Sequence, residues 1–215
     1  RHLREQLSII GGSLVVAGLH NKVRVHIHVN DPAEVFRIAA RFGAVTGEKA
    51  DDMQRQQHSA HVTGRRVAVV TDSAADIPFD EMDRLDIHMV PIRVHFGDRS
   101  YLDKVGLTAE EFFVEIARNP QHPKTSQPPP GDFRRQFEYL GSHFDSVVSV
   151  NLSRQVSGTC GAAEAAAARV STHGKVTVLD SMNASLGQGL VAMYAAECAQ
   201  AGYDAARVIE ATRAI

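Results

Sequence analysis

The amino-acid sequence predicts an α/β fold, in which a mostly parallel sheet with flanking helices follows a small α+β segment made of a strand hairpin and a helix. Three observations support this prediction. From residue 66 onward, short runs of Val, Ile and Leu alternate with stretches of helical periodicity, as in βαβ units. These runs lack polar alternation, as expected for parallel strands covered on both faces. Before residue 60, one short segment alternates with period two instead, which is typical of a half-exposed strand.

The first part of the chain begins in a polar, helix-like stretch and continues as two strands. We expect them over residues 13–18 and 23–29, joined by a turn. In the second strand, Val and Ile occupy one face. The polar residues of the other face are Arg24, His26 and His28.

A helix is expected to cover this hairpin. Asp31 is suited to cap its start, and Pro32 fits the first helical position. Apolar residues then recur at helical spacing as far as Phe42, and Gly43 is expected to end the helix.

A polar, unpatterned stretch around residues 50–65 divides the chain. We expect a partial α+β domain over residues 1–58, a linker over residues 59–64, and an α/β portion over residues 65–215. Both ends fall inside helix-like patterns without a cap. We therefore expect the chain to be a piece of a longer protein.

The second part is predicted to alternate strands with helices. The expected strands cover residues 66–71, 87–96 with a break at Pro91, 101–102, 146–152 and 176–179. The expected helices begin after Thr108, at Gly131-Asp132, at Ser157, at Gly187 and after Asp204. Thr108 and Glu111 have the spacing of a capping box.

Short hydroxyl-rich segments recur next to strand ends and helix starts in this second part. They are Thr71-Asp72-Ser73, Thr125-Ser126-Gln127-Pro128, Ser153 with Ser157-Gly158-Thr159, and Asp180-Ser181. Because the carboxyl ends of parallel strands line one crevice, where ligands bind, these segments are expected to converge there.

Converging hydroxyls can bind a carboxylate or a phosphate with neutral donors, aided by backbone N–H groups at a helix start. The triple proline at Pro128-Pro129-Pro130 would hold the segment before it rigid and extended. The alternative is that each Ser or Thr only caps a helix or forms a turn. Sequence alone leaves both interpretations open for any one segment.

Several function classes lack their sequence signals. The formal net charge of −2 gives no general attraction to nucleic acid. No G-x-G-x-x-G follows the strand expected over residues 66–71, and neither the P-loop glycine motif nor G-x-S-x-G is present, so the nucleotide-binding and serine-hydrolase interpretations lack their motifs. No apolar run is long enough for a transmembrane segment. The two widely spaced cysteines, Cys160 and Cys198, do not form a disulfide framework, which favours a cytoplasmic location.

His26 and His28 lie two residues apart on a predicted strand, so their rings are expected to point to the same face. Two imidazoles could supply part of a zinc site, which needs at least one more protein ligand. A polar strand face that includes Arg24 is the other interpretation. No cysteine lies in residues 1–64 to complete such a site.

Four motifs, taken in order, resemble the DegV family over residues 65–215. They are residues 69–78 (VVTDSAADIP), 124–128 (KTSQP), 151–153 (NLS) with 156–159 (VSGT), and Leu179-Asp180-Ser181 with Gly187-Gln188-Gly189. The resemblance implies a fatty-acid-binding protein that holds one acyl chain and presents its carboxylate to a separate kinase. It also implies that the carboxylate is bound by Thr125, Ser126 and Ser153.

Further strand-end residues would support that site by the same resemblance: Asp72, Ser73, Ser157, Gly158, Thr159, Asp180 and Ser181. Arg154 departs from the pattern, because the family more often has a small hydroxyl residue there. The chain also stops about halfway through the family's length.

Residues 1–60 resemble the middle domain of the fatty-acid kinase catalytic subunit, which is related to dihydroxyacetone kinase. The resemblance rests on Gly12 to Val16, on the stretch from Val23 to Pro32, and on Met53 and Gln57. In that family the His-x-His pair contributes to a zinc site together with an upstream cysteine. The resemblance thus implies zinc at His26 and His28 in a longer protein.

Together the two resemblances imply a bacterial fatty-acid carrier that works with a fused or partner kinase domain. The expected ligand is a long-chain fatty acid, and this piece is expected to be non-catalytic and to hold no cofactor by itself. An alternative is a dihydroxyacetone-kinase-like phosphotransferase, in which this chain is a docking or oligomerisation module. A homodimer is compatible with either interpretation.

Overall fold

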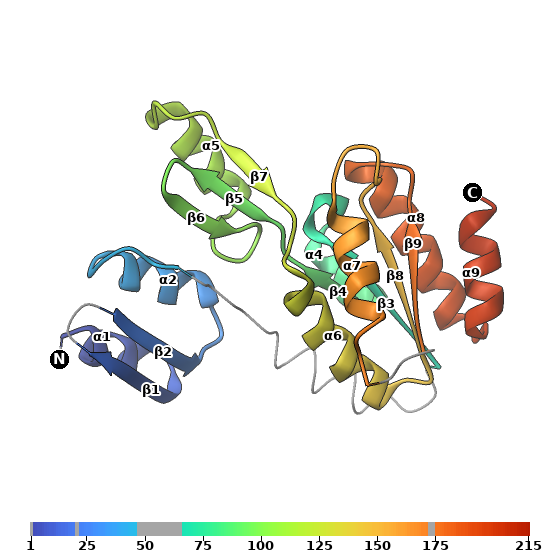
Figure 1. Cartoon of the computed structure of the whole chain (residues 1–215), viewed down its shortest axis with the longest axis horizontal. Coiled ribbons are helices and arrows are strands. Elements are labelled where there is room, and N and C mark those ends of the chain that lie inside the picture. The colour runs from blue at the N-terminus through green and yellow to red at the C-terminus, as the bar shows by residue number, and fades with distance from the viewer. Residues whose placement is uncertain (1, 20–21, 47–65, 172–174) are drawn as a thin grey trace. The chain divides into compact units, whose positions relative to one another are not determined.

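The computed structural model describes residues 2–19, 22–46, 66–171 and 175–215 (Figure 1). The chain forms two compact units. One unit is built from described residues of 1–50 and 94–124, and the other from those of 51–93 and 125–215. The linker predicted at residues 59–64 lies outside the described residues, so the predicted domain boundaries stay a prediction.

The first unit contains the predicted hairpin and helix. Its elements in this region are α1 (His2–Ile10), β1 (Gly12–Leu19), β2 (Lys22–His28) and α2 (Pro32–Ala40). The strands pair antiparallel, with Val16 opposite Val25. Asp31 caps α2 as predicted, since its carboxylate accepts a hydrogen bond of 2.9 Å from the Ala33 N–H. The predicted end at Gly43 is wrong, because α2 ends at Ala40 with Arg41 as its C-cap.

A small sheet of order β6-β5-β7 belongs mostly to the first unit, but Arg93 of β5 and Thr125 and Ser126 of β7 belong to the second. The elements of this region are β5 (Arg93–Phe96), β6 (Arg99–Leu102), α5 (Ala109–Arg118) and β7 (Lys124–Ser126). Gly97 makes the turn between β5 and β6 with φ of 60°, a conformation that glycine adopts without strain. The capping box of α5 is confirmed, with distances of 3.0 Å from Thr108 N to the Glu111 carboxylate and 3.2 Å from Glu111 N to Thr108 Oγ1.

The second unit is organised around a four-stranded sheet of order β4-β3-β8-β9, in which every neighbouring pair is parallel. The strands are β3 (Val67–Asp72), β4 (Ile87–Val90), β8 (Ser146–Asn151) and β9 (Val176–Asp180). Both central strands are almost wholly buried, because helices cover the two faces of the sheet. The predicted α/β fold class is therefore confirmed.

Two layers of helices form the core with this sheet (Figure 1). One face is covered by α4 (Phe79–Leu85), α8 (Ser185–Gln200) and α9 (Ala205–Arg213), and the other by α6 (Pro130–His143) and α7 (Thr159–Ala167). Small alanines of α8, such as Ala192 and Ala195, are fully buried and allow the helix to lie close to the strands. Among the residues described, no helix combines the length and hydropathy needed to cross a membrane.

Several predicted helix boundaries are corrected by the structure. The helix expected from Ser157 begins at Thr159, with Gly158 as its N-cap. The helix expected from Gly187 begins two residues earlier at Ser185, and the one expected from Gly131 begins at Pro130. The seven-residue helix α4 is absent from the sequence-based prediction. The cap of α9 is confirmed, since Asp204 accepts a hydrogen bond of 2.9 Å from Arg207 N.

Candidate functional site

The order of the sheet places a topological switch point at the carboxyl ends of β3 and β8. The chain leaves β3 toward β4 on one side of the sheet, whereas β8 leads to β9 on the other side. Ligands of open α/β sheets bind at such a switch point, outside the carboxyl ends of the strands. The register brings the strand ends level, with Thr71 beside Val150 and Asn151 beside Asp180. The predicted segments after β3, β8 and β9 therefore lie at one edge.

Asp72 is fully buried at this edge and joins the ends of β3 and β8. One carboxylate oxygen accepts a hydrogen bond from Ala74 N at 3.1 Å. The other accepts from Leu152 N at 2.9 Å and from Asn151 Nδ2 at 3.2 Å. Because three N–H groups of the protein bond to this carboxylate, Asp72 holds the two loops in place, and its predicted ligand contact stays a prediction.

Ser73 and Ser153 are buried hydroxyls at this edge with donor capacity left over. Ser73 Oγ accepts a hydrogen bond of 3.0 Å from Ile92 N, and Ser153 Oγ accepts one of 3.3 Å from Gln155 N. Within the described part of the chain, neither hydroxyl hydrogen has an acceptor of its own. A serine hydroxyl donates one hydrogen bond as well as accepting. Both serines can therefore donate to an acceptor brought by a ligand.

The helix α7 starts beside Ser153 with a second pair of hydroxyls. Ser157 Oγ and Thr159 Oγ1 lie 2.9 Å apart, and Thr159 N donates to Ser157 Oγ at 3.2 Å. One hydroxyl of the pair donates to the other, so a single hydroxyl hydrogen remains for another acceptor. Gly158 precedes the first turn and provides no side-chain cap.

A close approach at Gly158 brings the Thr125-Ser126 segment to the start of α7. A Cβ atom at position 158 would overlap Oε1 of Gln127, so the end of the Gln127 side chain would have to move to make room for it. Thr125 and Ser126 are exposed, whereas Pro128 is buried and anchors the segment. The predicted extended backbone is seen in β7 and again at Pro129, with φ of −64° and ψ of 148°, whereas Pro130 already begins α6.

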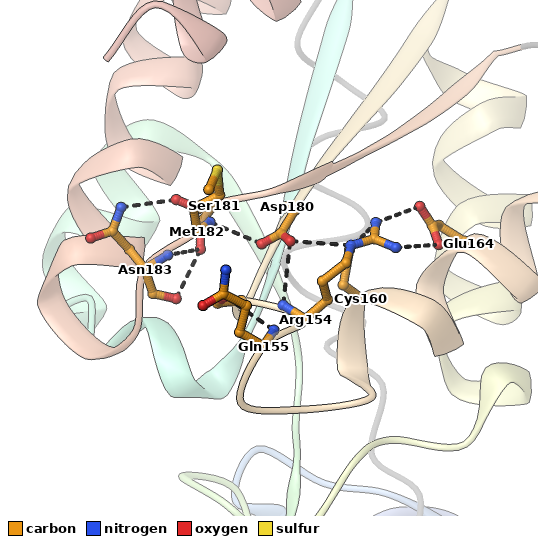
Figure 2. Close-up of polar contacts among 9 residues, drawn as sticks. Arg154, Gln155, Cys160, Glu164, Asp180, Ser181, Met182 and Asn183 are labelled. Atoms are coloured by element: carbon orange, nitrogen blue, oxygen red, sulfur yellow. Dashed lines mark hydrogen bonds and ion pairs between the residues drawn. The ribbon is translucent and has the colours of Figure 1, made fainter.

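Asp180 and Ser181 build the loop after β9 (Figure 2). Asp180 accepts hydrogen bonds from Met182 N at 2.9 Å and from Arg154 Nε at 3.1 Å. The Ser181 hydroxyl donates to the carbonyl oxygen of Asn183 at 3.0 Å. The polar groups of both residues are thus engaged by the protein itself, and their predicted ligand contact stays a prediction.

Two buried polar residues at this edge were not among the predicted site residues. Asn151 donates to Asp72, and Gln188 on α8 donates from Nε2 to Thr71 Oγ1 at 3.1 Å. Gln188 is fully buried, and its Oε1 has no hydrogen-bond partner among the described residues. Both residues belong to the motifs that carry the family resemblance, Asn151 at the end of β8 and Gln188 between two glycines, and that position is the signal that could have indicated them.

Three residues other than glycine at this edge have left-handed backbone, as do three elsewhere in the described part of the chain. Asp76, Met182 and Ser185 have positive φ values of 50°, 52° and 53°. The hydroxyl of Ser185 donates to the Asp76 carboxylate at 2.7 Å, which joins the segment after β3 to the start of α8. Left-handed conformations in residues other than glycine are uncommon and concentrate at functional sites.

The predicted metal pair lies on β2 in the other unit. Nε2 of His26 and Nε2 of His28 are 3.2 Å apart, so the rings share one strand face as predicted. The described residues contain no group of three or more His, Cys, Asp or Glu side chains arranged to hold a metal ion. Zinc binding by this pair therefore stays a prediction.

Comparison with known proteins identifies relatives of both parts. Residues 66–215 match the DegV family of uncharacterised proteins, and residues 1–60 match the FakA-like middle domain of fatty acid kinases. Protein DegV of Bacillus subtilis is 38% identical over 136 residues, which cover 63% of this chain and 48% of that protein. A DegV domain-containing protein of Deinococcus radiodurans is 35% identical over 144 residues, or 67% of this chain and 50% of that protein.

Solved structures share the fold. DegV from Bacillus subtilis, described as a fatty acid binding protein, superposes with a TM-score of 0.65 at 35% identity over 70% of this chain and 53% of that chain. A DegV family protein from Thermus thermophilus, described by its fatty acid binding, superposes with a TM-score of 0.64 at 35% identity. The match covers 69% of this chain and 52% of that chain. This chain spans about half the length of the relatives that it matches. Because the family match covers residues 66–215, more than half of the sequence, the chain belongs to the DegV family.

Proposed function

We propose that this chain is the carboxylate-binding part of a fatty-acid carrier, which holds the acyl head group for phosphorylation by a fused or partner kinase domain. One observation carries the proposal: the buried hydroxyls of Ser73 and Ser153, at the switch point of the sheet, have hydrogens without an acceptor among the described residues. A carboxylate supplies the acceptors that these hydroxyls lack. The fatty acid binding described for the Bacillus and Thermus relatives supports this assignment.

Apolar side chains on the same loops support an acyl ligand. Val156 in the β8–α7 loop is 69% exposed and Met182 in the β9–α8 loop is 73% exposed. Leu186, in the first turn of α8, is also exposed. Apolar surface beside polar groups is typical of a ligand-binding region. A fatty acid has the matching chemistry, since its polar head group continues into a hydrocarbon tail.

The proposed mechanism is presentation of the substrate. The hydroxyls of Ser73, of Ser153 and of the Thr125-Ser126 segment bind the carboxylate oxygens, while Asp72 and Asp180 fix the loops. Neutral donors leave the negative charge on the carboxylate, which is the nucleophile when an acyl phosphate forms. The kinase supplies the nucleotide, and the match of residues 1–60 to a fatty acid kinase-like middle domain supports this partner. A cytoplasmic location belongs to the same proposal.

Zinc at His26 and His28 is a further part of the proposal. Two tetrahedral ligands with Zn–N distances of about 2.0–2.1 Å lie roughly 3.3 Å apart, and the two Nε2 atoms are 3.2 Å apart. The pair thus fits two positions of a zinc site, and a longer protein would provide the remaining ligands. Bound zinc would hold the hairpin to the segment that carries those ligands.

The decisive experiment is to identify the bound lipid. The purified protein, with whatever sequence flanks this chain in its gene, is extracted under denaturing conditions and analysed by lipid mass spectrometry. We expect a stoichiometric amount of bound fatty acid. If the protein contains no bound lipid and also takes up no added fatty acid, the carrier function is disproved. Replacing both Ser126 and Ser153 by Ala should weaken binding by roughly 1.5–3 kcal/mol for each hydrogen bond lost to the carboxylate. Ser142→Ala is the matched control, because its hydroxyl bonds only within α6.

A further inference from the structure

Arg154 has a set of contacts that the proposed carboxylate site does not use (Figure 2). Its Nε donates to Asp180 Oδ2 at 3.1 Å. Its two terminal nitrogens donate to the two carboxylate oxygens of Glu164 on α7, at 2.8 and 3.4 Å. Arg154 therefore joins the β8–α7 loop, on which it lies, to the end of β9 and to the second turn of α7.

The positive charge of Arg154 is already paired with negative charges of the protein. One guanidinium faces the carboxylates of Glu164 and Asp180. The hydrogen bond to Glu164, followed by the charges of Cys160 and Glu164 and the hydrogen bond to Asp180, raises the pKa of Arg154 above its ordinary value. Its side chain is 52% exposed, so each ion pair is partly screened by water. The two terminal nitrogens, which form the fork that can hold a carboxylate, already face the carboxylate of Glu164, and one of them also contacts Cys160 Sγ at 3.4 Å. Direct binding of a head group by Arg154 is therefore disfavoured.

The Arg154–Asp180 pair connects the two loops of the site. Asp180 also accepts from Met182 N, which has left-handed backbone, so the same carboxylate shapes the loop after β9. Two backbone hydrogen bonds of 3.0 Å join the loops nearby, from Ser153 N to Asn183 O and from Ser181 N to Asn151 O. The position of Ser153 depends on this arrangement, because its neighbour Arg154 is held through both its backbone N–H and its side chain.

We infer that Arg154 is a positioning residue, which fixes the β8–α7 loop so that the hydroxyl of Ser153 is held ready to donate to the ligand. This inference rests on the proposed function. Arg154 itself does not touch the ligand. A planar guanidinium suits the task, because its fixed fork can hold two carboxylates on different segments at once.

The test measures binding of radiolabelled palmitate and oleate in a double-mutant cycle of Arg154→Ala and Ser153→Ala. We expect Arg154→Ala to lower affinity about tenfold in the wild-type background, the effect of one misplaced hydrogen bond to a charged group. In the Ser153→Ala background it should lower affinity by less than about twofold, because coupled residues act non-additively. Arg154→Lys should restore part of the affinity, since lysine can reach one carboxylate but lacks the fork.

Arg84→Ala is the matched control. The Arg84 side chain is also 52% exposed and pairs with Glu81 at 2.6 Å, but it lies at the end of α4, before β4 begins. Removing it deletes an ion pair of similar exposure without touching the site loops. We expect its affinity for both acids to be unchanged.

Hydrogen exchange of the lipid-free protein gives a second measurement that needs no ligand. Peptides covering residues 151–157 and 179–184 should exchange faster in Arg154→Ala and not in Arg84→Ala. If the wild type binds fatty acid, and Arg154→Ala leaves both affinity and exchange unchanged, this inference is overturned and the carrier function stands. An equal loss of affinity in both serine backgrounds would also overturn it, because Arg154 would then act independently of Ser153. Wild-type protein that takes up neither acid would overturn the carrier function and this inference together.

Discussion

At the scale of single residues, Gly158 lies against the end of the Gln127 side chain, which belongs to the segment before α6. The Gln127 side chain occupies the space that a Cβ at position 158 would need. Gln127 is exposed and flexible at its far end, so it can move when that space is filled. A substitution here is therefore expected to shift the Thr125-Ser126 segment and to leave the packing of the core unchanged.

We predict that Gly158→Ala lowers fatty-acid affinity by about 1 kcal/mol, the value of one hydrogen bond. The free energy of unfolding in urea should change little. Gly161→Ala is the control, because a Cβ there meets nothing within 4 Å. That variant should gain up to about 1 kcal/mol of stability from helix propensity and bind fatty acid normally. Normal binding by Gly158→Ala would show that the approach at Gly158 does not position the segment.

Residue types at the strand ends were predictable from the sequence, but their partners were not. The sequence indicated Asp72 because it follows a buried apolar strand. Its carboxylate accepts a hydrogen bond from the backbone N–H of Leu152, which is 80 positions away in the sequence. Only the order of the strands makes Asp72 and Leu152 neighbours. Ser153 was equally indicated, and there the structure leaves a hydroxyl hydrogen available among the described residues.

At the scale of elements, the hairpin of β1 and β2 was predictable because its pattern is local. In a strand, side chains two residues apart lie on the same face, so the alternation alone predicts that His26 and His28 are neighbours. The seven-residue helix α4 was missed, because its exposed first turn and only two buried residues give a weak periodic signal. The errors at the starts of α7 and α8 have a related cause, since neither helix has a side-chain cap.

The hairpin yields a prediction about metal content. We expect the purified protein, with its natural flanking sequence, to contain zinc that is lost when both His26 and His28 are replaced by Ala. Elemental analysis by mass spectrometry measures it directly. His143→Ala is the control, because that ring bonds within α6. Equal zinc content in the paired variant and the wild type would rule out these histidines as ligands.

At the scale of the whole molecule, the chain forms two compact units, and the proposed head-group residues all belong to the one that contains the parallel sheet. A ligand stabilises the state to which it binds in proportion to the logarithm of its concentration. Stabilisation should therefore be confined to the unit that binds the fatty acid.

We predict that saturation with a fatty acid at about 100 times its dissociation constant stabilises the parallel-sheet unit by about 2.7 kcal/mol. In hydrogen exchange, protection should rise in peptides from β3, β8 and the loops after them. Peptides from β1 and β2 should not change and act as an internal control. Uniform protection of both units, or none, would contradict the assignment of the ligand to the parallel-sheet unit.

The fold class, most of the elements and the strand-end motifs that mark the site were predictable from the amino-acid order, because periodicity, caps and turn residues depend on near neighbours in the chain. Which polar groups remain available to a ligand depended on the folded arrangement of distant segments. Asp72, Asp180 and Ser181 are bound by the protein's own groups, whereas Ser73 and Ser153 keep a hydrogen to donate within the described part of the chain. Each hydrogen bond needs a specific donor and a specific acceptor in contact, and the order of the strands in the sheet determines which donors and acceptors are in contact.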